Sequence, residues 1–447
     1  MKNTSVLSGL ALAIITVLFF SGQVAFGFGK NQVRLEVLPS HPVLMSDKKQ
    51  KTTIKVGLTG FEIEQIQRSK VNVSLVVDKS GSMHGDKIKR AKEAAEMMVE
   101  LLGKDDVFSL VAYSSTVETL VPSTKLSDKQ DVIKQIRKIR ADGSTALFGG
   151  VSKGLAEVRK FLSPHIANRV ILISDGLANI GPSSPQALGK LGASAAREGI
   201  AITTIGLGLG YNEDLMVQLA QNSDGNHAFV ENSNDLARIF REELGDVLSV
   251  VAQEVEITIE CPPGVRPLRV IDRNAEIRGQ KILLSLNQLY SNQEKYLLLE
   301  VEIPEEQTGI KRDIAKVNVV YSNIITQKKE TITQTAMVSF DKSEATVKRK
   351  INKKVVVQKT KAIANERSKK AVQLRDKGDV QGASSLMMQN VELFKSQADV
   401  LEEPELLEES EKELKDAEEV RKRGSSWGKA RKALKKKQYK KENQTKY

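Results

Sequence analysis

The sequence predicts an α/β domain with a mostly parallel sheet, an adjoining all-β sandwich and a C-terminal helical hairpin. Between residues 70 and 250, apolar strand candidates alternate with helical segments, a rhythm typical of parallel strands joined by helical crossovers. Residues 251–345 contain short strand candidates without strong helices, and helical spacing returns from about residue 350. A chain of 447 residues, 40% of them hydrophobic, is long enough for two or three domains.

The N-terminus has the layout of a secretory signal. Lys2 supplies a positive charge, residues 6–20 are mostly apolar, and small residues follow up to Gly27. We therefore predict a signal peptide over residues 1–27, with an uncleaved signal acting as a membrane anchor as the alternative. The single cysteine, Cys261, excludes an internal disulfide framework. These features together favour an extracytoplasmic bacterial protein that is periplasmic, at the cell surface or secreted.

Residues 31–69 contain two alternating apolar runs, VRLEV and TIKVGL. Such period-two patterns predict half-buried strands. The segment 251–345 offers further strand candidates at 255–260, 282–286, 296–303, 316–322 and 331–340. Because five strands make a thin sandwich, we expect the two N-terminal strands to complete it, with the α/β domain inserted between them.

The α/β domain, residues 70–250, contains buried strand candidates that each lead into a helix. We predict strands at 71–78, 107–114, 168–176, 200–208 and 227–230, and helices at 86–103, 128–139, 146–162, 184–199, 213–225 and 233–248. Ser184 followed by Pro185 is a typical helix start. Ligands of such sheets collect at the carboxyl ends of the strands, where Asp78 and Asp175 stand.

The C-terminal third divides by charge. We predict helices over residues 350–420, with a hairpin turn at Gly378 and Asp379 and an acidic helix from Pro404. Residues 399–419 have a net charge of −9, whereas residues 421–447 have a net charge of +11. We predict that this basic tail is disordered, because it contains few apolar residues.

The basic tail could bind an anionic membrane surface or a cell-wall polymer. The alternative is a tail that only increases solubility or that folds back on the acidic segment 399–419. Its few aromatic residues are too sparse for base stacking, which disfavours nucleic acid.

Oxygen-bearing side chains follow two of the predicted strands and precede one of the helices. Asp78, Ser80 and Ser82 lie on a turn after the first strand, Thr145 lies before the helix 146–162, and Asp175 ends the strand 168–176. Hydroxyl and carboxylate oxygens are the ligands of a hard cation such as Mg²⁺. A Ser-Gly-Ser turn taken alone is equally explained by turn chemistry. The three segments together predict a metal site.

This pattern resembles the von Willebrand factor type A domain with its metal-ion-dependent adhesion site. The resemblance covers about residues 70–250, and all five family positions are present: Asp78, Ser80, Ser82, Thr145 and Asp175. It implies a doubly wound, Rossmann-like fold. It also implies that the serines and the threonine contact Mg²⁺ or Mn²⁺ directly, and that the aspartates do so directly or through water. One coordination position is then open to an acidic side chain of a protein partner. The domain order is weakly similar to that of inter-alpha-trypsin inhibitor heavy chains.

The sequence gives less support to a nucleotide site, a catalytic nucleophile or a zinc site. The segment IGLGLG at 205–210 has the wrong spacing for a dinucleotide loop, so we expect no nucleotide. Ser80 lacks the GxSxG setting of a nucleophile, and Cys261 is expected to be a packed thiol. The four histidines lie far apart, which disfavours a zinc site.

We therefore expect a protein that binds a partner through a metal, as an adhesion or scaffold protein and not an enzyme. Two alternatives stay open. The first is a structural cell-envelope protein that binds anionic polymer or membrane through residues 421–447. The second is a metal-assisted hydrolase.

Overall fold

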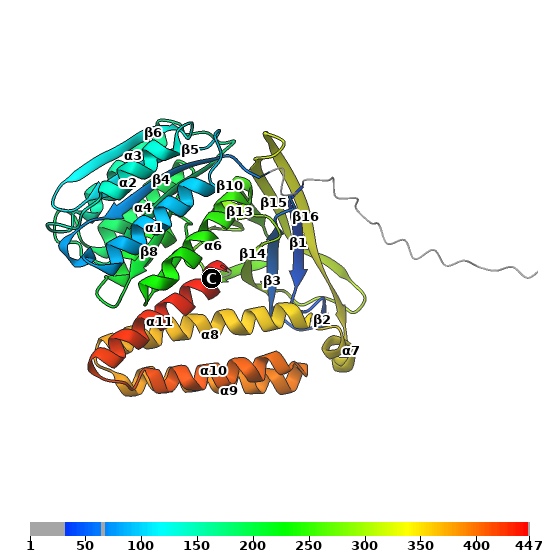
Figure 1. The fold of residues 1–447 in the computed structure, drawn as a ribbon. Helices are drawn as coiled ribbons and strands as arrows, with labels where there is room; N and C mark the ends of the chain where they lie inside the picture. The colour runs from blue at the N-terminus through cyan, green and yellow to red at the C-terminus, as the bar shows by residue number, and fades with distance from the viewer. Residues whose placement is uncertain (1–31, 64–67, 446–447) are drawn as a thin grey trace, which may run out of the picture.

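The computed structural model describes residues 32–63 and 68–445. It confirms the predicted fold class: a mostly parallel α/β sheet, a second all-β unit and C-terminal helices (Figure 1). The predicted signal peptide, residues 1–27, lies outside the described residues. Within those residues, no helix combines the length and the apolar character that a membrane crossing requires.

The α/β sheet has six strands in the order β6-β5-β4-β7-β8-β9. Its strands are β4 (Val71–Asp78), β5 (Val107–Tyr113), β6 (Val117–Lys125), β7 (Ala167–Ser174), β8 (Ile200–Leu207) and β9 (His227–Val230). All neighbouring pairs are parallel except β5 and β6, which are antiparallel. Strand β6 was not predicted, because this half-exposed edge strand has a proline at position 122 and no continuous apolar run.

Helices cover both faces of this sheet, as the alternation of side chains along β4 requires. Val73, Leu75 and Val77 belong to one core, and Val76 belongs to the other. The first core is covered by α1 (Asp86–Leu101), α2 (Lys129–Lys138) and α6 (Leu236–Leu248). The second is covered by α3 (Leu147–Arg159), α4 (Pro185–Arg197) and α5 (Glu213–Asn222). The Ser184 side chain caps α4 by accepting a hydrogen bond from the Ala187 N–H at 3.2 Å.

The all-β unit consists of two sheets packed around one core. One sheet contains β1 (Arg34–Pro39), β3 (Gln50–Thr59), β14 (Glu294–Ile303) and β11 (Arg266–Ile271). The other contains β12 (Glu276–Arg278), β13 (Lys281–Tyr290), β10 (Val250–Glu260), β15 (Lys311–Asn323), β16 (Lys328–Asp341) and β2 (Val43–Met45). Since β3 pairs with β14 along ten residues, the N-terminal strands belong to this unit and the α/β domain interrupts it.

The C-terminal segment contains α7 (Glu344–Arg349), α8 (Lys353–Asp376), α9 (Val380–Leu401), α10 (Pro404–Glu419) and α11 (Gly424–Asn443). Helix α8 lies between the sandwich and the α9–α10 layer, and α11 turns back to the α/β domain (Figure 1). The turn between α8 and α9 is at Gly378, whose φ is 92°. Asp379 then caps α9 by accepting from the Gly382 N–H at 2.7 Å.

The prediction that residues 421–447 form a disordered tail is wrong for Gly424–Asn443, which fold into α11. Two kinds of contact hold this helix. Ala430, Leu434 and Tyr439 are buried, and most of the basic side chains contact carboxylates or backbone carbonyls, as do Lys437 with Asp416 and Lys441 with Glu413. A count of apolar residues does not detect such pairing.

Candidate metal centre

The five predicted site residues lie at the carboxyl edge of the parallel sheet. Asp78 is the last residue of β4, and Asp175 directly follows β7, the strand next to it. Ser80 and Ser82 lie on the turn between β4 and α1, and Thr145 precedes α3. Parallel pairing of β4 with β7 therefore brings two loops together, and α3 adds the third.

Hydrogen bonds join four of these residues into one chain of contacts. The Asp78 Oδ1 atom accepts from the Ser80 N–H at 2.8 Å. The hydroxyls of Ser80 and Ser82 are 3.2 Å apart, and the Ser82 hydroxyl donates to Asp175 Oδ1 at 2.8 Å. The second oxygen of Asp78 accepts from the Ser174 hydroxyl at 2.6 Å. The two strand-end carboxylates are thus connected through two serines.

Thr145 reaches the same place because residue 176 is a glycine. A Cβ atom at Gly176 would lie 3.1 Å from Thr145 Oγ1 and 3.4 Å from Asp78 Oδ2. The two oxygens border one point that a side chain at position 176 would fill. A Cβ atom at this position would be in tight contact with the Thr145 side chain, which would have to shift by a few tenths of an ångström.

Backbone contacts fix the three loops against one another. The Gly81 N–H donates to the Gly143 carbonyl at 3.0 Å, and the Asn179 N–H donates to the Thr145 carbonyl at 3.1 Å. In return, Asn179 Oδ1 accepts from the Thr145 N–H at 2.7 Å. Asn179 was not among the predicted site residues. Its position in the loop that directly follows Asp175 could have suggested it.

Two carboxyl groups and one ammonium group meet at this edge. Burial raises the pKa of the Asp78 carboxyl, the charge of Asp175 adds to the rise, and hydrogen bonds from Ser174 and Ser80 oppose it. The Lys87 ammonium from the first turn of α1 contacts Asp175 Oδ2 and donates to the Ser82 carbonyl at 3.3 Å. A positive group therefore already lies against the second carboxylate, which the sequence analysis also missed.

The donor set fits a hard divalent ion. Every predicted ligand offers oxygen, three of the five through neutral hydroxyls, and Mg²⁺ prefers oxygen ligands in octahedral geometry. The described residues contain no group of three or more His, Cys, Asp or Glu side chains that could hold a metal. A cation at this edge would depend on the serine and threonine hydroxyls.

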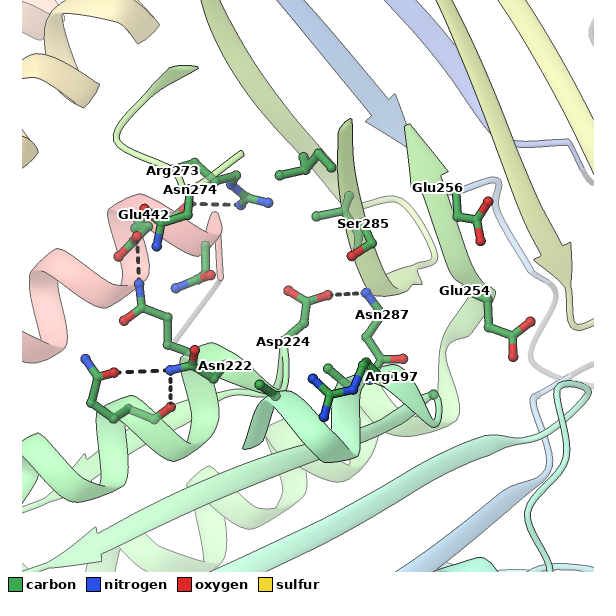
Figure 2. Close-up of a pocket in the computed structure, with 18 residues that line it drawn as sticks. Arg197, Asn222, Asp224, Glu254, Glu256, Arg273, Asn274, Ser285, Asn287 and Glu442 are labelled. Carbon is green, nitrogen blue, oxygen red and sulfur yellow. Dashed lines mark hydrogen bonds between the residues drawn. The ribbon is translucent and has the colours of Figure 1, made fainter. Parts of the chain in front are cut away.

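A cavity lies at the opposite edge of the sheet. This cavity of about 860 Å³ is bordered by α4, α5, β13 and the end of α11 (Figure 2). In it, Asp224 accepts from the Asn287 N–H at 2.6 Å and pairs with Lys295, so the α/β domain and the sandwich are joined there. The carboxyl edge of the sheet lies at the other end of the strands, where Ser82 is exposed and the other four predicted ligand residues are buried: Asp78, Ser80, Thr145 and Asp175.

Cys261 is buried, and burial raises the pKa of its thiol to about 11.

Gly206 in the segment 205–210 packs against the Tyr211 ring. The absence of a side chain at position 206 leaves room for this ring.

Comparison with known proteins identifies the α/β domain. The profile of the von Willebrand factor type A domain matches residues 72–242. The chain contains a von Willebrand factor type A domain. Domains of this type typically mediate protein–protein interaction or adhesion, and they commonly bind a divalent metal.

Curated relatives match part of the chain at low identity. An uncharacterized protein of Synechocystis sp., sll0103, is 24% identical over 57% of this chain and 63% of its own length. YfbK of Escherichia coli is 26% identical over 48% of this chain and 38% of its own length. Inter-alpha-trypsin inhibitor heavy chain H2 of Mus musculus is 25% identical over 44% of this chain and 22% of its own length. The chain thus spans less than two thirds of each of these relatives.

Two solved structures share the fold over most of the chain. A von Willebrand factor type A protein from Catenulispora acidiphila has a TM-score of 0.68 and 15% identity, covering 87% of this chain and 90% of its own. The ArnB paralog VWA2 from Sulfolobus acidocaldarius has a TM-score of 0.60 and 17% identity, covering 91% of this chain and 98% of its own. Their extent indicates that the sandwich and the C-terminal helices accompany this domain elsewhere.

Proposed function

We propose that this protein is a metal-dependent protein-binding protein. Asp78, Ser80, Ser82, Thr145 and Asp175 hold Mg²⁺ or Mn²⁺, and a carboxylate of the partner completes the coordination shell. The observation that carries the proposal is the convergence of oxygens from three loops, with Ser82 bonded to Asp175 and Thr145 and Asp78 bordering Gly176.

The residues of this chain have separable roles in the proposal. The hydroxyls of Ser80, Ser82 and Thr145 supply neutral oxygens, so a bound cation keeps enough positive charge to attract an incoming carboxylate. Asp78 and Asp175 supply the negative charge that attracts the cation. Asn179 holds the Thr145 backbone through paired hydrogen bonds, which fixes the third hydroxyl relative to the other two.

The place of action that we propose is outside the cytoplasm, on the basis of the N-terminal sequence pattern. The role is adhesion or scaffolding rather than catalysis.

Binding of anionic polymer through the basic segment has less support than the metal site. The side chains of Arg431, Lys432 and Lys435 pair with Glu213 and Asp214 of α5. A polymer would have to compete with these internal partners for the same cations.

The metal can be tested through its effect on unfolding. A ligand that binds the folded chain stabilises it by about 2.7 kcal/mol at one hundred times its Kd, so Mg²⁺ or Mn²⁺ should raise the Tm and EDTA should reverse the rise. Thr145→Val removes one ligand with little change in shape and should abolish the rise. Ser144→Ala, which removes a hydroxyl from the same loop, should retain it.

The same variants then test the partner. Capture of a protein from an envelope extract of the source cells should require the metal, fail with Thr145→Val and survive with Ser144→Ala. A Tm that ignores both metals, together with capture that ignores EDTA, would refute the proposed function.

A further inference from the structure

Three large aliphatic side chains are exposed around the candidate metal centre. Leu177 is 58% exposed, Ile180 38% and Leu209 50%. Leu177 and Ile180 lie in the loop after Asp175, and Leu209 lies in the loop after β8. We refer to these three residues as the apolar rim.

Backbone contacts fix the apolar rim to the predicted ligand residues. Leu177 follows Gly176, which borders Thr145 and Asp78. The Ile180 N–H donates to the Thr145 carbonyl at 3.3 Å. Leu177 and Ile180 are therefore held beside the loop that carries the third hydroxyl.

The other loop lies close to the site at its two glycines, Gly208 and Gly210. A Cβ atom at Gly210 would lie 3.4 Å from the Asp175 carbonyl oxygen, and one at Gly208 would lie 3.6 Å from Lys87 Cε. Leu209 stands between these two glycines, so its backbone is held beside Asp175 and Lys87.

Exposed leucine and isoleucine lose the free energy that burial would provide, about 25 cal/mol for each Å² kept in water. A cluster of such residues at one place marks an interaction surface more often than scattered ones do. Leu101 and Leu162 are also exposed, but Leu101 is the last residue of α1 and Leu162 follows α3, both at the opposite edge of the sheet. They provide an internal comparison for the rim.

We propose that the apolar rim contacts the residues beside the coordinating carboxylate, so that the partner is a protein segment with one acidic residue flanked by aliphatic or aromatic side chains. This proposal rests on the proposed function, because it takes the metal-bound carboxylate as its fixed point. The metal supplies attraction for a single carboxylate, and the rim supplies apolar area on either side of it.

A highly charged polyanion does not fit this surface. It would bring several negative groups to a place that offers one expected metal ion and the Lys87 ammonium, which already contacts Asp175, beside the aliphatic side chains of the rim. Such groups would lose hydration against the rim without gaining a partner. An acidic residue within an apolar loop gains from both parts of the site.

The experiment uses the full chain and a displayed library of disulfide-closed loop peptides with a central glutamate and randomised flanks. Selection is carried out in Mg²⁺ and repeated in EDTA. We expect the enriched loops to carry Leu, Ile, Val or Phe beside the glutamate. The best peptide should bind the Leu177→Ser, Leu209→Ser double variant about tenfold more weakly than wild type.

The matched control is the Leu101→Ser, Leu162→Ser double variant, which removes two exposed leucines from the opposite edge and should bind as wild type does. Both double variants should keep the Mg²⁺-dependent rise in Tm, which shows that the fold and the metal site are intact. Polar flanks in the enriched loops, or an equal Kd for both double variants, would overturn the rim proposal alone.

Two further outcomes are also decisive. Enrichment that persists in EDTA, or with glutamine in place of the central glutamate, would refute the proposed function itself. A Mg²⁺-dependent dimer in sedimentation that the rim variant loses would assign the rim to a second copy of this chain, and would overturn the peptide partner.

Discussion

The candidate metal centre and the junction between α11 and the α/β domain both bury charge, but they balance it differently. At the junction, Glu213 contacts Arg431 and Lys432, whose side chains are 17% and 8% exposed. Lys432 also donates to the Tyr211 carbonyl at 2.8 Å. At the metal centre, two buried carboxylates, Asp78 and Asp175, lie near one partly exposed ammonium.

This difference separates a structural site from a binding site. Burying a charge costs free energy unless a partner of opposite sign and hydrogen bonds compensate it. The junction supplies its own cations and is complete without a ligand. The metal centre has more buried negative charge than Lys87 balances, and burial raises the pKa of Asp78. We therefore expect substitutions at the junction to change stability, and substitutions at the metal centre to change binding.

The largest expected effect tests the junction. Glu213→Ala leaves the Arg431 and Lys432 charges buried with fewer partners, and should lower the free energy of unfolding by about 3 kcal/mol. Urea unfolding followed through Trp427, the single tryptophan, reports this directly because Trp427 lies on α11. The Mg²⁺ affinity of the folded protein should not change.

A surface pair on the same helix supplies the control. Lys429 and Glu231 form an ion pair with about half of each side chain exposed. Glu231→Ala should cost less than about 1 kcal/mol, as exposed pairs do. Equal losses for Glu213→Ala and Glu231→Ala would show that the junction does not depend on its buried charges.

An intermediate effect is expected from pH. His227 packs edge-on against the Tyr439 ring of α11, and burial, together with the charges of Lys436 and Lys432, lowers the pKa of His227 to about 3. Between pH 6.5 and 3 the unfolded chain binds this proton and the folded chain does not, so stability falls as pH falls through that window. From pH 8 to pH 5 the His227 contribution is about 2 kcal/mol.

The check is a comparison of wild type with His227→Gln by urea unfolding at several pH values. Other groups titrate too: burial raises the pKa of Asp272 to about 6. The difference between the two proteins isolates the histidine. As the pH falls from 8 to 5, the free energy of unfolding of wild type should fall more than that of His227→Gln. A constant difference would contradict the assignment.

The smallest expected effect tests the charge balance at the metal centre. Lys87→Met removes the ammonium from Asp175 and should tighten Mg²⁺ binding about fivefold, because a nearby positive charge repels the ion. Calorimetric titration measures the change. Lys89→Met makes the same charge change at an exposed position two residues along α1 and should leave the affinity near that of wild type. Weaker binding by Lys87→Met would mean that Lys87 positions Asp175 rather than opposing the ion.

The strands that are buried on both faces could be predicted from the sequence. Each apolar run that ends in a polar residue, such as 71–78 with Asp78, became a strand of the parallel sheet, and the Ser184-Pro185 pair marked the start of α4 correctly. The five predicted ligand residues could be selected because strand ends of a parallel sheet meet at one edge. Their metal binding stays a prediction.

Features that depend on contacts distant in sequence could not be predicted. Helix α11 folds because Lys432 meets Glu213, more than two hundred residues earlier. Lys87 meets Asp175 across 88 positions. The exposure of Leu177, Ile180 and Leu209 could not be predicted either, because leucine and isoleucine are residue types that usually lie in the core.

The most direct test of the central claim is an anomalous diffraction map of crystals grown with Mn²⁺. We predict one peak bordered by the hydroxyl oxygens of Ser80, Ser82 and Thr145, within coordination distance of all three. In Thr145→Val crystals the peak should be lost or weakened. A map without a peak at the carboxyl edge of β4 and β7, or with Mn²⁺ bound only elsewhere, would contradict the claim.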